Sequence, residues 1–194
     1  MIYLLRHGQT EYNLEGRYQG GSDSPLTALG RRQGLAYGER LADHLRDGEI
    51  WSSPLPRATD TAGLLAAALP GVPVRIDARL REISFGQWDG MTRAEIEQGW
   101  PGQRKHHPPR QWMFHAPGGE GLTAAQDRLR AVLHDAGQTA GDVILVSHGI
   151  TGRLMRGLHA GVSLEAALRL DVPQDLIFRL HPGGAIDALP RTAP

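Results

Sequence analysis

The chain has 194 residues, enough for one domain with a sizeable core. Its 21 basic residues balance its 21 acidic residues, so net charge does not draw it to nucleic acid or to a membrane surface. It contains no cysteine, which excludes disulfides, zinc–thiolate sites and a cysteine nucleophile. The apolar run at its N-terminus is too short for a signal peptide and no stretch is long enough to span a bilayer, so we expect a cytoplasmic protein.

A first strand is predicted at residues 2–5, a short apolar run that leads into Arg6, His7 and Gly8. In an open α/β sheet, ligands collect at the carboxyl ends of the central strands. An imidazole beside a permanently charged guanidinium suits nucleophilic attack on an anion such as phosphate. The three residues also fit a histidine that merely follows a strand and an arginine that is a solvated surface charge. The choice depends on whether the rest of the chain supplies partners.

Turn-forming residues between positions 11 and 25 predict a long loop directly after this histidine. A helix is predicted to begin after Thr27, a candidate N-cap, and to end near Leu45. A second strand follows at residues 49–52. The apolar residues expected in the core around this helix are Leu26, Leu29, Ala36, Leu41 and Leu45.

The second strand ends in Ser52 and Ser53, and a helix is predicted to begin at Pro54 and to run to about Leu69. Arg57 falls in the first turn of this helix, where a cation faces the positive end of the helix dipole. An anion bound between them would remove this conflict, because helix N-termini and arginine both favour phosphate. The alternative is an exposed arginine of no functional consequence.

A third strand is predicted at residues 74–77, and Glu82 follows it among apolar and aromatic neighbours. A carboxyl group in partly apolar surroundings retains its proton more readily, which suits a general acid. A salt bridge to Arg79 or Arg81 explains the local sequence equally well.

Residues 92–98 predict a short helix, and the proline-rich segment 100–119 has no regular pattern. Its bulky aromatic residues, Trp112 and Phe114, indicate a cap over a pocket rather than a linker. Three histidines in this segment suggest a metal site, but the prolines and the absence of cysteine favour surface histidines and no metal. These histidines are His106, His107 and His115.

A helix is predicted at residues 122–136, and residues 142–146 form the clearest buried strand pattern in the chain. This strand leads into Ser147, His148 and Gly149, so a second strand ends in His-Gly. A histidine that only filled the core would more naturally lie within the strand than at its end. The remaining predictions are a helix to about His159, short strands at 168–170, 177–180 and 185–189, and a frayed tail at 190–194.

Four separated motifs occur in the order found in the histidine phosphatase superfamily, the phosphoglycerate mutase-like group, which the chain resembles from residue 2 to about residue 156. The motifs are Arg6-His7-Gly8 with Asn13, Ser52 through Arg57-Ala58 to Thr61-Ala62, Glu82 ahead of Gly86, and Ser147-His148-Gly149. The resemblance implies an α/β fold, a three-layer sandwich around a mostly parallel sheet. It further implies a single domain over residues 1–194, with a short cap insertion at about 92–120.

The resemblance also implies a phosphohistidine intermediate on His7, with Glu82 as the acid that protonates the leaving oxygen. Arg6, Arg57 and His148 would bind the phosphoryl oxygens and supply positive charge, so no metal or other cofactor is expected. The further substrate contacts that it implies are Asn13, Gln19, Gly20 and Gly149. The expected partner is a small phosphorylated metabolite rather than nucleic acid or a membrane, bound by a monomer or a homodimer.

The sequence FGQWDG at residues 85–90 looks like the phosphatase branch, near the alpha-ribazole phosphatase and broad-specificity phosphatase types. Glycolytic mutases carry a longer insert with a pair of arginines that hold the substrate carboxylate, and the segment 82–120 has no adjacent arginine pair. Relatives usually have Gly-Glu-Ser where this chain has Gly-Glu-Gly at residues 119–121, so a hydroxyl that often supports the pocket is missing. We expect a phosphomonoester hydrolase; the alternatives are a cofactor-dependent phosphoglycerate mutase and a non-catalytic phospho-ligand binding protein.

Overall fold

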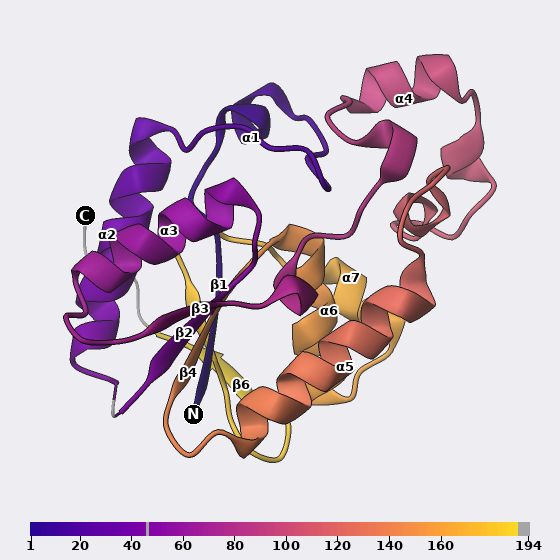
Figure 1. Ribbon diagram of the computed structural model, residues 1–194. Coiled ribbons are helices and arrows are strands. Elements are labelled where there is room, and N and C mark those ends of the chain that lie inside the picture. The colour runs from indigo at the N-terminus through magenta and orange to yellow at the C-terminus, as the bar shows by residue number, and fades with distance from the viewer. Residues whose placement is uncertain (46, 190–194) are drawn as a thin grey trace.

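The computed structural model describes residues 1–45 and 47–189, which fold around a six-stranded sheet of order β3-β2-β4-β1-β5-β6 (Figure 1). The strands are β1 (Ile2–Arg6), β2 (Glu49–Ser52), β3 (Val74–Ile76), β4 (Val143–Ser147), β5 (Ile177–Leu180) and β6 (Ile186–Ala188). Strands β1 to β4 pair in parallel, whereas β5 and β6 join one edge antiparallel. The predicted mostly parallel sheet is confirmed.

Helices cover both faces of the sheet and produce the predicted three layers (Figure 1). On one face α2 (Ala28–Ala42) packs against α3 (Pro56–Ala67); on the other α5 (Leu122–Gln138) packs against α6 (Gly149–Ala160), which α7 (Leu164–Arg169) contacts. Two short helices, α1 (Glu11–Glu15) and α4 (Arg93–Gly99), complete the α-helices, and 3-10 turns occur at Ala78–Leu80, Gly86–Trp88, Gln103–Lys105 and Trp112–His115. No helix in the described part of the chain combines the length and apolar composition needed to cross a membrane.

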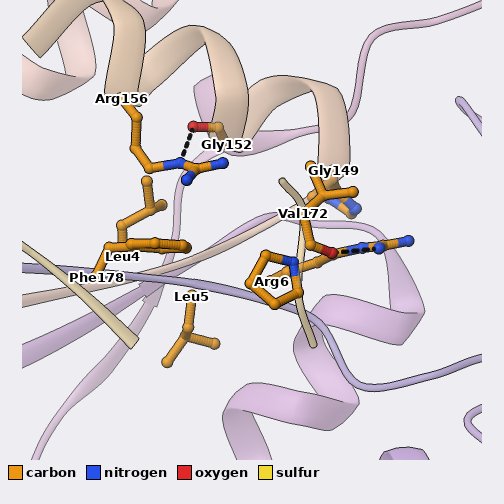
Figure 2. A pocket seen from close by; sticks show the side chains of 10 residues that line it. Leu4, Leu5, Arg6, Gly149, Gly152, Arg156, Val172 and Phe178 are labelled. Carbon is orange, nitrogen blue, oxygen red and sulfur yellow. Dashed lines mark hydrogen bonds between the residues drawn. The ribbon is translucent and has the colours of Figure 1, made fainter. Parts of the chain in front are cut away.

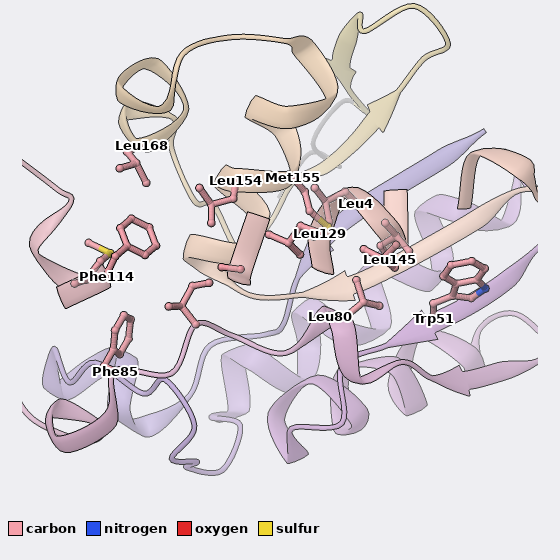
Figure 3. Packing of buried hydrophobic residues seen from close by; sticks show 14 of the residues in the cluster. Leu4, Trp51, Leu80, Phe85, Phe114, Leu129, Leu145, Leu154, Met155 and Leu168 are labelled. Carbon is pink, nitrogen blue, oxygen red and sulfur yellow. The ribbon is translucent and has the colours of Figure 1, made fainter. Parts of the chain in front are cut away.

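Alternation along the strands divides the core into two hydrophobic clusters. Leu5 of β1 belongs to the cluster that contains Tyr37 of α2. Its neighbour Leu4 points to the opposite face and belongs to the cluster that contains Leu129 of α5. That second cluster extends from the sheet to Phe114 in the predicted cap segment (Figure 3). The apolar surface of the segment 100–119 is thus anchored in the main core.

Two element predictions need correction. The predicted loop 11–25 contains α1, because Thr10 and Asn13 form a capping box that starts a helix among the turn-forming residues. The strand predicted at 168–170 is instead the end of α7, for which Ser163 supplies the N-cap. The tail predicted at 190–194 lies outside the described residues.

Leu29, predicted to lie in the core, is exposed on α2. The buried face of α2 consists of small residues with Tyr37 and Leu41. A Cβ atom at Gly38 would lie 2.5 Å from the Leu65 carbonyl oxygen of α3, so a glycine is needed for the two helices to approach this closely. Helix geometry places Leu29 on the face of α2 opposite Gly38, and this face is exposed.

Candidate active site

Three neighbouring parallel strands bring predicted site residues together at their carboxyl ends. His7 directly follows β1 and His148 directly follows β4, and the register pairs Arg6 with Ser147. The two imidazole rings lie 5.2 Å apart between centroids. On the other side of β4, the end of β2 places Ser53 Oγ 2.7 Å from His148 Nε2. The two His-Gly signals therefore converge, as expected at the carboxyl ends of adjacent parallel strands.

A pocket of about 140 Å³ opens at the carboxyl ends of these strands. The predicted site residues that line it are Arg6, His7, Asn13, Gln19, Gly20, Arg57, Glu82 and Gly149. The rest of its lining is Arg17, Tyr18, Phe85, Ile150 and Val172. His148 instead lines an adjoining cavity of about 20 Å³. Arg6, Gly149 and Val172, which Figure 2 shows around that cavity, line both spaces.

His7 is 2% exposed and has a defined tautomer. Its Nδ1 lies 2.7 Å from the Gly8 carbonyl oxygen, which only accepts hydrogen bonds, so Nδ1 carries the proton and Nε2 keeps its lone pair. Burial lowers the pKa of His7 well below its usual 6.5, and the guanidiniums of Arg6 and Arg57 lower it further. At neutral pH His7 is therefore an uncharged imidazole with a free Nε2, the form a nucleophile requires.

Arg57 is buried and holds the loop that precedes α2. Its Nη1 donates to Ser22 O at 2.8 Å and to Asp23 Oδ1 at 2.9 Å, and its Nη2 donates to Gly20 O at 2.9 Å. Asp23 Oδ1 also accepts from the backbone N–H of Arg57 at the start of α3. The anion predicted between Arg57 and this helix terminus is therefore supplied by the chain itself, as Asp23. The case for phosphate binding rests instead on the donors that remain unpaired.

Three buried nitrogen atoms without a partner in the described part of the chain belong to residues predicted to bind phosphoryl oxygens, and two of them are guanidinium donors. Arg6 donates from Nη1 to Val172 O at 2.8 Å (Figure 2), but its buried Nε has no partner among the described residues. The same holds for Arg57 Nε and for His148 Nδ1. Buried donors are almost always satisfied, so unpaired groups at one edge of a sheet indicate a site for an anion. The fork of N–H groups on each arginine suits phosphate in particular.

The prediction that His148 contributes positive charge needs correction. Burial lowers the pKa of His148 well below 6.5, and the nearby Arg57, His7 and Arg6 lower it further. His148 is therefore neutral near pH 7 and offers a hydrogen bond rather than a full charge. Of the three residues predicted to hold the phosphoryl group, only the two arginines are cations.

These two histidines should make stability depend on pH. In the unfolded chain a histidine titrates near pH 6.5, whereas in the folded protein both pKa values are well below 6.5. Above pH 6.5 both histidines are neutral in the folded and the unfolded chain, so no stability is lost through their protonation. As pH falls below about 6.5 the unfolded chain gains protons first, and stability falls by up to roughly 1.4 kcal/mol per pH unit per histidine. In urea titrations between pH 7 and 5, His7→Gln and His148→Gln should each flatten this slope; an unchanged slope would contradict the assignment.

Asn13 is oriented by contacts that no motif revealed. Its Oδ1 accepts from Thr10 N at 3.1 Å and from Gln174 Nε2 at 2.9 Å. Gln174 also donates to the backbone carbonyl oxygen of His7 at 3.2 Å. Because Oδ1 is occupied, the Nδ2 amide of Asn13 is the end left for a ligand. Gln174 lies 161 residues beyond Asn13, so only the fold brings them together.

Gln19 and Gly20 form part of the pocket wall. Gln19 Nε2 lies 2.7 Å from Thr10 Oγ1, and its buried Oε1 has no partner among the described residues. Gly20 has φ of 49°, and a Cβ atom there would lie 1.7 Å from Asp89 Oδ1. Only glycine therefore allows this loop to pack on Asp89 and to offer the Gly20 carbonyl oxygen to Arg57.

Glu82 is 8% exposed, and its carboxylate accepts hydrogen bonds from N–H and O–H donors. Oε1 accepts from Ile83 N, Thr151 N and Thr151 Oγ1 at 3.0, 3.0 and 2.9 Å, and Oε2 accepts from Ile150 N at 3.1 Å. Ile150 and Thr151 lie in the first turn of α6, a helix without a side-chain cap of its own. The carboxylate of Glu82 therefore caps α6.

The surroundings of Glu82 also settle the competing interpretation of its sequence. Arg79 pairs with Asp77 and Asp135, and Arg81 pairs with Glu120, so neither forms the suggested salt bridge to Glu82. A Cβ atom at Gly149 would lie 3.7 Å from Glu82 Oε2 and from the Arg6 guanidinium. Gly149 thus lies close to both the candidate acid and a candidate phosphate ligand.

The predicted cap segment supports the pocket wall without lining it. Tyr18 lines the pocket and contacts Phe85 edge-on, with ring centroids 5.9 Å apart. Trp112 of the cap packs against Tyr18 at 5.4 Å. The cap histidines His107 and His115 stack their rings 3.7 Å apart, and no group of three potential metal ligands occurs among the described residues.

Comparison with known protein families matches residues 2–184 to the histidine phosphatase superfamily (branch 1). The glucosyl-3-phosphoglycerate phosphatase of Mycolicibacterium vanbaalenii is 42% identical over 158 residues, which cover 76% of this chain and 68% of that protein. The probable phosphoglycerate mutase GpmB of Salmonella paratyphi C is 40% identical over 186 residues, which cover 92% of this chain and 83% of that protein.

Solved structures give the same result. A mycobacterial glucosyl-3-phosphoglycerate phosphatase in complex with VO3 superposes with a TM-score of 0.76 at 30% identity, covering 97% of this chain and 95% of that chain. A putative alpha-ribazole-5'-P phosphatase from Escherichia coli shares the fold, with a TM-score of 0.82 at 24% identity over 99% of this chain and 95% of that one. The chain therefore belongs to the histidine phosphatase superfamily, branch 1, and is an enzyme of that family.

Proposed function

We propose that this enzyme hydrolyses phosphomonoesters of small metabolites through a phosphohistidine intermediate on His7. One observation carries the proposal: a neutral imidazole with a free Nε2 shares a pocket with guanidiniums whose buried Nε–H groups are unpaired. A nucleophile for phosphorus and donors for its oxygens are thus held together before substrate arrives.

The reaction would proceed in two steps. First, His7 Nε2 attacks phosphorus, the P–O bond to the alcohol breaks, and Glu82 donates a proton to the leaving oxygen. Second, water attacks the phosphohistidine, Glu82 takes up the proton of that water, and inorganic phosphate leaves with Nε2 free again. In both steps Arg6, Arg57 and His148 stabilise the negative charge that spreads over the equatorial oxygens. Neither step uses a metal or another cofactor.

The charges in the pocket support a hydrolase over a mutase. Besides Arg6 and Arg57, the cation that lines the pocket is Arg17, and its guanidinium already contacts Glu15 at 2.6 Å and Glu95 at 2.9 Å. No unpaired guanidinium therefore remains among the described lining residues to hold a substrate carboxylate beside the phosphoryl group. The observation that supports the mutase alternative is the 40% identity to the probable phosphoglycerate mutase GpmB.

Product analysis should separate these two functions. We expect the enzyme, assayed with EDTA, to release inorganic phosphate from phosphomonoesters and to form little 2-phosphoglycerate from 3-phosphoglycerate. The panel should include sugar phosphates, nucleotides, phosphoserine, alpha-ribazole phosphate and glucosyl-3-phosphoglycerate, since two of these appear in the names of relatives. Robust formation of 2-phosphoglycerate with a bisphosphoglycerate primer would overturn the proposal, and loss of activity in EDTA would contradict a metal-free reaction.

Vanadate provides the control for this assay. The mycobacterial relative binds VO3, and the same group should compete with substrate for the donors of this pocket. Phosphate release that vanadate inhibits competitively would come from this site rather than from a contaminant. Release that vanadate leaves unchanged would not support the proposed function.

A further inference from the structure

We propose that Ser53 is a positioning residue that fixes the tautomer of His148, so that His148 presents Nδ1–H to the transferring phosphoryl group. The effect on phosphoryl transfer rests on the proposed function, whereas the tautomer of His148 is inferred from hydrogen bonding alone. Ser53 follows the end of β2, next to the strand that carries His148. Neither its place in the sequence nor the matched motif assigns it a role.

The hydroxyl of Ser53 has a fixed set of neighbours. Ser53 is 0% exposed, and its backbone N–H donates to Val146 O at 3.0 Å. Its Oγ accepts the backbone N–H of Leu55 at 3.2 Å and lies 2.7 Å from His148 Nε2. No other hydrogen bond of this hydroxyl occurs in the described part of the chain. His148 Nε2 is therefore the acceptor available for the Ser53 proton.

This arrangement determines where His148 carries its own proton. If Ser53 O–H donates to Nε2, then Nε2 holds the lone pair and Nδ1 carries the hydrogen. Nδ1 is buried without a partner among the described residues, and the centroid of the His148 ring lies 5.2 Å from that of His7. An N–H in that position can donate to an oxygen of the phosphoryl group on His7.

The opposite tautomer leaves more groups unsatisfied. A proton on Nε2 would donate to Ser53 Oγ, and the hydroxyl hydrogen of Ser53 would then be buried without an acceptor. Nδ1 would carry a lone pair, which repels a phosphoryl oxygen instead of binding it. Buried donors without acceptors are disfavoured, so the hydrogen-bond network selects the first tautomer.

The tautomer matters because His148 is neutral. Burial and the neighbouring Arg57, His7 and Arg6 lower its pKa well below 6.5, so the imidazole carries a single N–H near pH 7. A doubly protonated ring would present a donor on either side without help. A neutral ring presents a donor to the phosphoryl group only when its other nitrogen is occupied as an acceptor.

A double-mutant cycle tests this role. We expect Ser53→Ala to slow the phosphorylation of His7 by about 10- to 100-fold, by analogy with the loss of a group that orients a metal-bound histidine. The same substitution in a His148→Ala background should have no further effect, because there is no tautomer left to fix. Ser52→Ala is the matched control: Ser52 is equally buried, and its Oγ donates to the Ser53 carbonyl oxygen rather than to His148. It should keep near wild-type rates, and a Ser53→Ala effect that persists in the His148→Ala background would overturn the proposal.

Nitrogen NMR reads the tautomer without any substrate. In the resting wild-type protein we expect the His148 signals, assigned by their loss in His148→Ala, to show a protonated Nδ1 and an unprotonated Nε2. In Ser53→Ala the two forms should mix or reverse. A wild-type signal with the proton on Nε2 would overturn the proposal even if Ser53→Ala fails to fold. Absence of phosphatase activity in the wild type would remove the proposed function and leave the tautomer result intact.

Discussion

Replacing His7 by alanine is expected to reduce hydrolysis of an aryl phosphate by about 10⁴-fold or more, as is typical for loss of a nucleophile. The substitution leaves Arg6, Arg57 and His148 in place, with their unpaired donors still at the pocket edge. Phosphate can therefore still bind, but no atom remains to attack phosphorus. The loss should appear in kcat rather than in KM.

Acid-labile phosphate provides the direct measurement. Mass spectrometry of acid-quenched wild-type enzyme should place the phosphoryl group on His7, and the alanine variant should carry none. His134→Ala is the matched control, because His134 lies on the exposed face of α5, and it should retain wild-type turnover. Vanadate binding and circular dichroism would show that His7→Ala is folded. Wild-type turnover in that variant would remove the whole assignment.

The strand ends of this site could be predicted from the sequence because parallel topology places the carboxyl ends of adjacent strands together. His7 and His148 each end an apolar run, and they meet because β1 and β4 pair in parallel. The order of the strands could not be predicted in this way. The placement of β4 between β1 and β2 is what brings Ser53 beside His148.

The partners of the functional side chains were beyond sequence patterns for a different reason. Asp23, Thr151 and Gln174 act through hydrogen bonds to residues far away in the chain, and an isolated polar residue has no periodicity to reveal it. The short segment at 168–170 shows the same limit for secondary structure. A run of that length fits a strand or a helix end, and packing against α6 decided for the helix.

The Glu82 carboxyl group has two possible roles, as a proton donor and as the cap of α6. The sequence offered a general acid or a salt bridge, but the arginines concerned bind other carboxylates. The structure replaces the salt bridge by a different structural role, since Glu82 accepts two backbone N–H groups from the first turn of α6. An experiment on Glu82 must now distinguish proton donation from helix capping.

Glu82→Gln separates these roles through the leaving group. The glutamine oxygen can keep the three donors that Oε1 accepts, but its amide N–H₂ would face the N–H of Ile150, so one capping bond is lost. Loss of a cap costs about 0.5–2 kcal/mol of stability, and any resulting disorder would slow all substrates alike. Loss of the proton donor would instead slow the substrates unequally. General acid catalysis contributes on the order of a hundred- to ten-thousand-fold, and only where the leaving oxygen is basic.

The rate of His7 phosphorylation should therefore fall much more with an alkyl phosphate, which leaves as a basic alkoxide, than with nitrophenyl phosphate, which leaves as a stabilised phenolate. Pre-steady-state measurements isolate this step, and phosphohistidine should remain detectable with both substrates. Thr151→Val is the matched control: it removes a hydroxyl that lies 2.9 Å from both Glu82 Oε1 and the Arg81 carbonyl oxygen but leaves the carboxyl group able to donate a proton. Its losses should be equal for the two substrates. Equal losses in Glu82→Gln as well would leave the capping of α6 as the only role of Glu82 and require the acid to be another group at the pocket.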